Sequence, residues 1–526
     1  MPNSGDLPEL ADAVLQPGFV GLTAPDWVRR RLAEGLGGVA LFARNVESPA
    51  QIAALTAQLR AERPDVIVAI DEEAGDVTRF ESRHGSSRPG NLGLGSVDDL
   101  ELTCAVARDL GMDLAHAGIT LDYAPDTDVN NNPDNPIIGV RAFGAEPALV
   151  ARHAAAWVRG LQDAGVAACA KHFPGHGDTA VDSHHDVPVI GHDRARLEEV
   201  ELVPFKAAIA AGVRSIMTGH LVVPAYDPEV PATLSRRILT GLLREELGFD
   251  GLIVTDAVEM QGVSRKYGIT GATVRAVAAG ADAICVGGDH ADEQTAIRLR
   301  DALVAAVRNG ELSEERLRDA ARRVRELAAW TLQTQTAVGA RAIADLAGTT
   351  PVPEVIAISG SAVGQAAARR ALRVTATEDA PQLPLEVAPH VVEFVPPRNI
   401  AIGAETPWGV GAPLGELLPG TTSARLSADD LAGTTDPVAP ILHGVGARPL
   451  VLVVRDAHRH PWIADALERT LAVRPDAIVV EMGVPVSVSG GLHLATYGAT
   501  RACGQAAAEL IAGSPVPDRT KQALAA

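Results

Sequence analysis

The fold prediction starts from residues 167 to 188, which read AACAKHFPGHGDTAVDSHHDVP. The first four residues are small and apolar, as in a buried β-strand, and Lys171 and His172 follow them directly. The remainder is broken by proline and glycine and is rich in aspartate and histidine. A buried strand that ends in reactive side chains indicates a site at the carboxyl end of a sheet.

The same pattern recurs along the first part of the chain, where apolar runs end in polar residues such as Asp71, Asp126, His220 and Asp256. Alternating β and α segments predict a parallel sheet. Charge at the carboxyl ends of its strands is typical of a TIM-like (β/α)8 barrel, whose active site is built from the loops at that face. Seven apolar runs are clear in the sequence, and we place the remaining strand of the barrel around residues 19–22. The predicted strands are 38–43, 66–70, 119–124, 167–172, 215–219, 252–255 and 283–287, and the predicted helices are 49–60, 97–117, 149–164 and 194–211.

The length of 526 residues and the hydrophobic content of 47% predict two domains, each with its own core. A helical run over residues 313–346 is followed by Gly348, Thr349, Thr350 and Pro351, which have the composition of a linker. We therefore expect an α/β barrel domain with catalytic function over residues 1–348 and a smaller, sandwich-like α/β domain over residues 349–526. In the second domain we expect strands at 354–359, 449–454 and 476–481 and a helix at 462–471.

The formal net charge of −20 argues against nucleic acid and anionic membranes as partners, because both would repel the protein. No run approaches the ~20 apolar residues of a membrane span, and the first residues lack the basic and apolar segments of a signal peptide. The cysteines form no CxxC pair, which predicts free thiols and a reducing compartment. We expect a cytoplasmic enzyme that acts on a small molecule or oligosaccharide.

Two parts of the chain could carry the chemistry. Asp182 lies two residues before His184, so its carboxylate can orient an imidazole that is well matched to proton transfer near neutral pH. Asp256 follows the apolar run of LIVTDAVEM, residues 252–260, and could either attack an anomeric carbon or cap the following helix. A nucleophile and a separate proton donor are what retaining glycoside transfer requires.

Five further side chains are suited to hold a sugar. Lys171 and His172 alternate faces at a strand end, so at least one points into the mouth of the expected barrel. Asp71 can accept hydrogen bonds from two hydroxyl groups, and Arg79 can donate to a substrate or form a simple salt bridge with Asp71. Arg141 lies in NPDNPIIGVRAFG, residues 132–144, which could equally be a structural loop.

The histidines do not predict a metal site. His172 and His176 have the i, i+4 spacing of ligands on a helix, but Pro174 and the neighbouring glycines disfavour a helix there, and no HExxH glutamate is present. We interpret three others as surface, capping or core residues: His185, His192 and His220.

Together the motifs resemble the β-N-acetylglucosaminidase branch of glycoside hydrolase family 3. The resemblance rests on DEEAGDVTR (residues 71–79), NPDNPIIGVRAFG, KHFPGHGDTAVDSHHDVP and TDAVEM (residues 255–260), and it spans about residues 15 to 345. It implies a retaining, exo-acting enzyme of two domains that needs no cofactor and cleaves terminal β-linked N-acetylglucosamine. By resemblance the nucleophile is Asp256, the acid/base is His184 with Asp182 as its partner, and the sugar-binding residues are Asp71, Arg79, Arg141, Lys171 and His172.

The chain also departs from the common family pattern. DEEAGDVTR stands where the bacterial cell-wall recycling enzymes have DQEGGRVQR, with Asp76 in place of an arginine, and TDAVEM replaces SDDLSM. Ala257 stands where β-glucosidase members have tryptophan, which argues against that branch. A histidine acid/base places no second carboxylate on the acceptor side, so phosphate is also permitted there. A β-N-acetylglucosaminide phosphorylase is therefore the alternative activity, and a non-catalytic sugar-binding protein is the alternative of another class.

Overall fold

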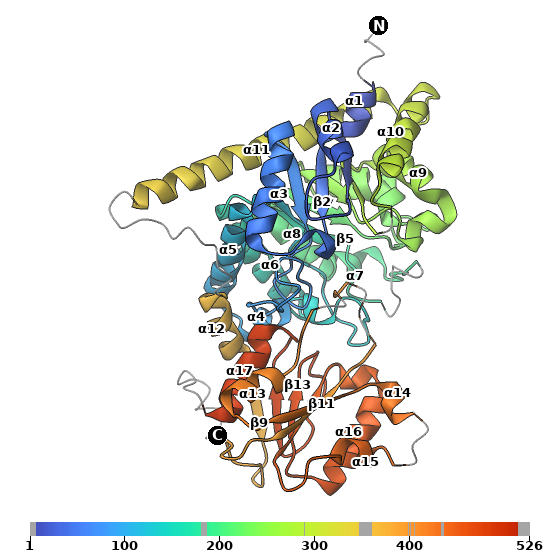
Figure 1. Cartoon of the computed structure of the whole chain (residues 1–526). Coiled ribbons are helices and arrows are strands. Elements are labelled where there is room, and N and C mark those ends of the chain that lie inside the picture. The colour runs from blue at the N-terminus through green and yellow to red at the C-terminus, as the bar shows by residue number, and fades with distance from the viewer. Residues whose placement is uncertain are drawn as a thin grey trace. The chain divides into compact units, whose positions relative to one another are not determined.

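The computed structural model of the chain describes residues 7–179, 187–288, 290–346, 360–397, 399, 401–403, 406–432 and 436–513, which form two compact units (Figure 1). The first unit takes the described residues up to Glu73, Thr103–Ile138, and those from Ala145 to Leu346. The second takes Ala74–Leu102, Gly139–Gly144 and the described residues from Gly360 onward. The predicted boundary between residues 348 and 349 lies outside the described residues. Two segments that precede it in sequence thus group with the second unit.

The first unit contains a parallel sheet with the strand order β2-β3-β4-β5-β6-β7. Its strands overlap six of the predicted runs: β2 (Gly38–Leu41), β3 (Ile67–Ile70), β4 (Leu121–Asp122), β5 (Ala167–Phe173), β6 (Ser215–Thr218) and β7 (Leu252–Thr255). The strand expected around residues 19–22 lies instead at β1 (Leu15–Pro17), because the chain leaves the extended conformation before Gly21, whose φ is +116°. β1 pairs in parallel with β8 (Ile284–Val286), and a bridge joins Val254 of β7 to Ala283 beside β8.

The helices of the first unit alternate with these strands, as predicted. The residues at which they begin are explained by local sequence features. Ser48 caps one helix by accepting the backbone N–H of Gln51, and Pro49 supplies the favoured first position. Alternate residues of the strands, such as Ile67 and Ala69, share one apolar cluster with residues of α11. The α-helices are α1 (Leu7–Ala13), α2 (Asp26–Glu34), α3 (Pro49–Glu62), α5 (Leu100–His116), α6 (Pro147–Asp163), α7 (Arg194–Glu199), α8 (Leu202–Ala210), α9 (Gln261–Ala279), α10 (Glu293–Arg308) and α11 (Glu314–Leu346), and a π-helix (Arg237–Glu246) lies between β6 and β7.

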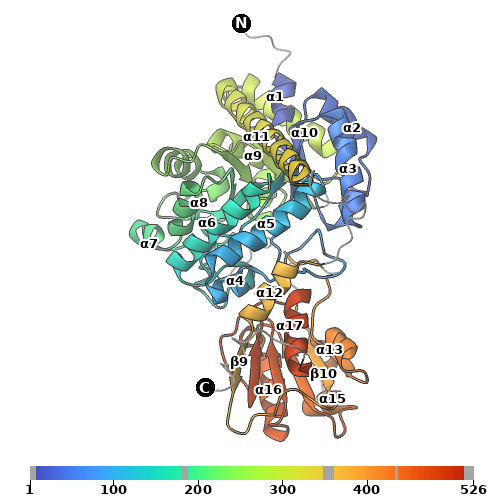
Figure 2. The same ribbon diagram turned by 90° about the vertical axis from the view of Figure 1, so that its left-hand side faces the viewer.

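The second unit is a three-layer α/β structure around a mixed sheet with the order β11-β10-β12-β13-β14-β9, in which β9 is antiparallel to β14 (Figure 2). Alternate strand residues face opposite layers: Val451 packs toward α12, α13 and α17, and Leu452 toward α15 and α16. The predicted strands at 449–454 and 476–481 and the helix at 462–471 are confirmed, whereas 354–359 lies outside the described residues. The strands are β9 (Arg373–Ala376), β10 (His390–Phe394), β11 (Thr422–Leu426), β12 (Leu450–Val454), β13 (Ile478–Glu481) and β14 (Leu492–Ala495); the helices are α4 (Asn91–Val97), α12 (Ala362–Ala371), α13 (Gly411–Leu417), α14 (Ala428–Leu431), α15 (Val438–Leu442), α16 (Pro461–Val473) and α17 (Arg501–Ala512).

The sequence predicted that the chain has no membrane-spanning segment and that its cysteines are free thiols. None of the described helices combines the length and the apolar sequence that a bilayer crossing needs. All four cysteines are free thiols; Cys104 is half-buried, and Cys169, Cys285 and Cys503 are buried. The prediction of free thiols is thereby confirmed.

Candidate active site

Lys171 lies at the carboxyl end of β5 and is held by two carboxylates. Its side chain is 1% exposed, and its ammonium group bonds to Asp71 and lies 2.6 Å from Glu73 Oε1. A buried ammonium is tolerated because these two charges compensate it. Glu73 is 3% exposed, but the side chain of Asp71, which follows β3, is 26% exposed. Asp71 is therefore the member of this cluster that a ligand can reach most easily.

His172, the next residue, is oriented by Asp128. Its ring Nδ1 lies 2.8 Å from Asp128 Oδ2, and Asp128 Oδ1 accepts the backbone N–H groups of His172 at 3.2 Å and His176 at 2.7 Å. Asp128 is itself buried. One carboxylate therefore fixes both the His172 imidazole and the start of the loop after β5, which preorganises this end of the strand.

A cation could be held at the same place. Ligand atoms of Asp126, Asp128 and His172 lie within 4.8 Å of one another, and all three residues are buried. The contact between His172 Nδ1 and Asp128 already satisfies that pair without an ion. His172 and His176 are not on a helix, as the sequence predicted, and their rings meet edge to face with centroids 6.0 Å apart.

Asp256 follows β7 directly, two strands along the sheet from β5. Its backbone N–H donates to the carbonyl of Thr218 on β6 at 3.2 Å, and its Oδ1 accepts the N–H of Ala257 at 2.8 Å. α9 begins only at Gln261, and its N-cap is Met260. The helix-cap alternative for Asp256 is therefore wrong, because a turn separates this residue from the helix. Asp256 thus has a half-buried carboxylate at the end of a strand and does not cap a helix.

Glu259 and His220 shape the surroundings of Asp256. Glu259 Oε1 accepts the N–H of Gly287 at 2.7 Å, and burial raises the pKa of Glu259 to about 7. Below that pH Glu259 is neutral and adds no negative charge near Asp256. His220 is buried, with its ring nitrogens bonded to Thr233 Oγ1 at 2.8 Å and to the carbonyl of Ala257 at 2.9 Å. His220 is therefore a buried residue, which is one of the three positions (surface, capping or core) that we predicted for it.

A further acidic residue, Glu201, lies against the loop that follows β5. A Cβ atom added to Gly175 would come within 2.7 Å of Glu201 Cβ, so the two segments are in close contact. The side chain of Asn131 lies beside the Glu201 carboxylate and favours its charged form. Burial raises the pKa of Glu201 to about 8, and the charges of Asp128 and Asp178 act in the same direction. Asp178 lies 2.5 Å from Nε2 of His192, a partly exposed histidine as predicted.

The other predicted site residues lie in different parts of the chain. Arg79 and Arg141 belong to segments of the second unit. Arg79 Nη2 donates to the carbonyl of Ala401 at 2.9 Å, and Arg141 is a buried residue of a short 3₁₀ turn whose carbonyl accepts from Asn91 Nδ2 at 2.7 Å. Asp182 and His184 lie outside the described residues. Asp71 and Lys171 are the predicted pair that the structure brings into direct contact.

Sequence reasoning missed three groups in this region. Glu73 shares the Lys171 ammonium with Asp71, Asp128 orients His172, and Glu259 lies beside Asp256. A period-two reading of DEE places the side chains of Asp71 and Glu73 on the same side, which could have identified Glu73. No sequence pattern connects Asp128 to His172, because 44 residues separate them.

These carboxylates and cationic donors at the carboxyl edge of a parallel sheet define a site of the kind that glycosidases use. The sequence profile of the glycosyl hydrolase family 3 N terminal domain matches residues 24–327, and the chain belongs to glycoside hydrolase family 3. A beta-hexosaminidase of Nitrosomonas eutropha is 40% identical over 287 residues, which cover 52% of this chain and 81% of that protein. Beta-hexosaminidase A of Pseudoalteromonas piscicida is 37% identical over 317 residues, which cover 56% of this chain but only 53% of the relative.

A solved structure resembles the chain over nearly its whole length. The family 3 beta-N-acetylglucosaminidase from Paenibacillus sp. str. FPU-7 is 33% identical, with a TM-score of 0.80 and coverage of 96% of each chain. The beta-N-acetylhexosaminidase of Beutenbergia cavernae DSM 12333 is 29% identical, with a TM-score of 0.56, and covers 61% of this chain and 98% of its own. The two-unit organisation is thus shared with the first of these structures.

Proposed function

We propose that this protein is a retaining, exo-acting β-N-acetylglucosaminidase that removes terminal β-linked N-acetylglucosamine. The observation that carries the proposal is Asp256: a half-buried carboxylate at the carboxyl end of β7, separated from α9 by a turn. The family membership and the beta-hexosaminidase names of relatives that are 37% and 40% identical support the same substrate class.

The proposed reaction is a double displacement. Asp256 attacks the anomeric carbon while His184, oriented by Asp182, gives its proton to the departing glycosidic oxygen. A covalent glycosyl-enzyme results. In the second step His184 takes a proton from water, whose oxygen attacks the anomeric carbon and releases Asp256. Two displacements at one carbon retain its configuration.

Sugar binding is assigned to Asp71, Lys171 and His172, which all belong to the first unit. For Arg79 and Arg141 the same role stays a prediction from their sequence motifs. The ion pair between Asp71 and Lys171 supports these roles, because it holds an acceptor and a donor side by side for adjacent hydroxyl groups. No step of this mechanism uses a metal or a cofactor. Phosphate in place of water stays the alternative acceptor, and it would yield a sugar 1-phosphate.

We also infer that the strands of the first unit close into a (β/α)8 barrel, the catalytic domain predicted for residues 1–348. The pairing of β1 with β8, the bridge from Val254 to Ala283, and a shared apolar cluster of alternate strand residues support closure. A cytoplasmic location stays a prediction from the spacing of the cysteines.

The test is a 5-fluoro N-acetylglucosaminyl fluoride, which keeps the 2-acetamido group and whose covalent adduct is located by mass spectrometry. We expect the adduct on Asp256, and a loss of about 10³-fold or more in kcat/KM for an aryl β-N-acetylglucosaminide in Asp256→Asn. The matched control is Asp250→Asn, at the opposite end of β7, because the Asp250 side chain is 91% exposed. An adduct elsewhere would contradict the assignment. Phosphorus NMR on the same reaction with added phosphate distinguishes hydrolysis from phosphorolysis.

A further inference from the structure

One side-chain pair joins residues on either side of the predicted acid/base. Nε2 of His192 lies 2.5 Å from Asp178 Oδ2, and the two residues are 14 positions apart in the chain. Because an ionised carboxylate can only accept, the imidazole Nε2 is the donor of this hydrogen bond. Asp182 and His184 lie between the two partners in the sequence, within residues 180–186, which are outside the described part of the chain and which we call the acid/base segment. The pair therefore brackets the predicted proton donor.

The residues just before Asp178 are anchored to the part of the chain that follows β4. Asn135 Nδ2 donates to the carbonyls of His176 and Gly177, at 2.9 Å in each case. A Cβ atom added to Gly177 would come within 1.8 Å of the Val129 carbonyl oxygen, so the two backbones are in direct contact and only glycine fits there. The chain therefore enters the acid/base segment from a fixed position.

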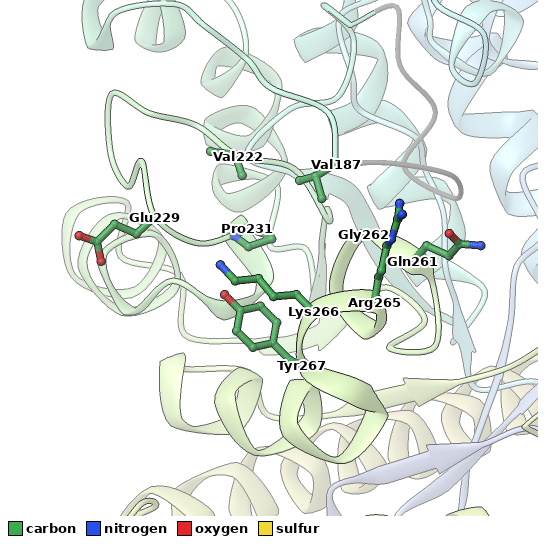
Figure 3. Close-up of a pocket in the computed structure, with 9 residues that line it drawn as sticks. All are labelled: Val187, Val222, Glu229, Pro231, Gln261, Gly262, Arg265, Lys266 and Tyr267. Carbon is green, nitrogen blue, oxygen red and sulfur yellow. The ribbon is translucent and has the colours of Figure 1, made fainter.

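The residues just after the acid/base segment are anchored to the loop that follows β6. Val187 lines a cavity of about 380 Å³ together with Val222 of that loop (Figure 3). The N–H of Val222 donates to the carbonyl of Pro188 at 2.8 Å, and the N–H of Ile190 donates to the carbonyl of Val222 at 2.9 Å. His192 follows two residues after Ile190, so its ring extends from an anchored part of the chain.

The hydrogen bond joins these two anchored parts directly to each other. Fourteen residues in a fully extended chain would span about 50 Å. Side-chain contact between Asp178 and His192 instead keeps the two ends together, which excludes most positions that His184 could otherwise take. The Asp178 side chain is 27% exposed and that of His192 is 36% exposed, so water weakens the pair only in part.

We propose that Asp178 and His192 are positioning residues for the acid/base His184. Their hydrogen bond holds the two ends of the acid/base segment at the spacing that lets the His184 imidazole meet the glycosidic oxygen. The inference rests on the proposed function, because that function gives His184 a proton to transfer. It deepens the function by naming two residues that act on the proton transfer through the segment between them. A proton donor must lie within hydrogen-bond reach of its acceptor, and a displacement of about 1 Å can slow a reaction about 100-fold.

The experiment separates proton donation from the other steps by the choice of leaving group, using the full chain. Phenyl β-N-acetylglucosaminide needs a proton on its departing oxygen, whereas the 3,4-dinitrophenyl analogue releases a stable anion without one. The measured quantity is the ratio of kcat/KM for the phenyl to the dinitrophenyl substrate, divided by the same ratio for the wild type. An exposed ion pair is worth up to about fivefold and a charge-assisted hydrogen bond more than about tenfold, so His192→Ala and Asp178→Ala should each lower the ratio about five- to tenfold.

Two further variants test whether the two residues act as a pair. The double variant Asp178→Ala/His192→Ala should lower the ratio no further than either single variant, because each single substitution already removes the hydrogen bond. His192→Gln should retain part of the wild-type ratio, because its side-chain amide can still donate to the Asp178 carboxylate. Falls that add up in the double variant would show that the residues act separately, and would overturn the proposal.

His116→Ala is the matched control, because it removes an exposed histidine at the last residue of α5, and it should leave the ratio unchanged. An unchanged ratio in His192→Ala, with kcat/KM either kept or lowered equally for both substrates, would overturn the proposal, since lost stability slows both reactions alike. His184→Ala is the reference, and its ratio should fall about 100-fold or more. An unchanged ratio in His184→Ala would instead count against the acid/base assignment in the proposed function, and would overturn this proposal with it.

Discussion

Replacing Glu201 by glutamine is expected to stabilise the protein increasingly as the pH rises above about 5, with the full effect at alkaline pH. Glu201 is 1% exposed, and burial raises its pKa to about 8 from the ordinary value of 4.5. Between these two values the folded protein retains a proton that the unfolded chain has released. The free energy of unfolding therefore falls as the pH rises through this window. Glutamine has nearly the same shape as glutamate and carries no charge at any pH. In Glu201→Gln this fall in the free energy of unfolding with rising pH should therefore be absent.

The magnitude follows from the size of the shift. Each pKa unit corresponds to about 1.4 kcal/mol, and a shift from 4.5 to about 8 therefore gives an upper limit of roughly 5 kcal/mol above pH 8. At pH 5 the same difference is below about 1 kcal/mol, because pH 5 lies only half a unit above the ordinary pKa of 4.5, which applies to the unfolded chain. For a unit of this size, 1 kcal/mol corresponds to roughly 2 °C in Tm. We expect Glu201→Gln to raise the Tm of the first unit by several degrees at pH 9 and to leave it nearly unchanged at pH 5.

Differential scanning calorimetry at pH 5, 7 and 9 measures this difference. The control is Glu198→Gln, an exposed residue of the preceding helix α7, which should shift Tm little at any of the three values. An equal shift at pH 5 and pH 9 would mean that glutamine acts through packing and not through charge. A lower Tm at pH 9 than the wild type would refute the assignment of a raised pKa to Glu201.

Three further predictions concern other charges. Asp76→Asn removes one partner of a buried ion pair, because Asp76 Oδ2 lies 2.5 Å from Arg455 Nη2. The free energy of unfolding of the second unit, measured by calorimetry, should fall by about 3–5 kcal/mol. The double variant Asp76→Asn/Arg455→Met should recover part of this stability. Lys171→Met leaves the charges of Asp71 and Glu73 uncompensated and should lower kcat/KM by about 10- to 100-fold; wild-type kinetics would contradict its role. Prolonged chelation should leave the activity unchanged, because no proposed step uses a metal. A loss that Zn²⁺ restores would assign Asp126, Asp128 and His172 to an ion.

The sequence predicted the strands well because burial imposes a simple pattern on them. β5 and β7 were recognisable from apolar runs, and the reactive residues were recognisable because they follow those runs. The contact between Asp71 and Lys171 is a consequence of this arrangement, since both residues stand at the carboxyl ends of parallel strands. Residues that directly follow strands of the same parallel sheet can thus be predicted to lie near one another.

Features that depend on tertiary contacts could not be predicted in this way. The residues after Asp256 have helical character in sequence, but the chain makes a turn as far as Met260 before α9 begins. The partner of His172 is Asp128, and the acidic residue that packs on Gly175 is Glu201; each comes from a distant part of the chain. Likewise, nothing local in residues 74–102 shows that they pack within the second unit.

The buried position of Asp76 has a consequence for how such a protein can evolve. Asp76 bonds to Arg455 and to the backbone N–H of Ala499, so residues far apart in the gene form one packed structure. A recombination event near residue 348 would replace Arg455 and Ala499 while keeping the old Asp76. Gene shuffling at that position should therefore give functional chimeras mainly between parents that share the acidic residue at 76 and the basic residue at 455, so the two positions are expected to be inherited together.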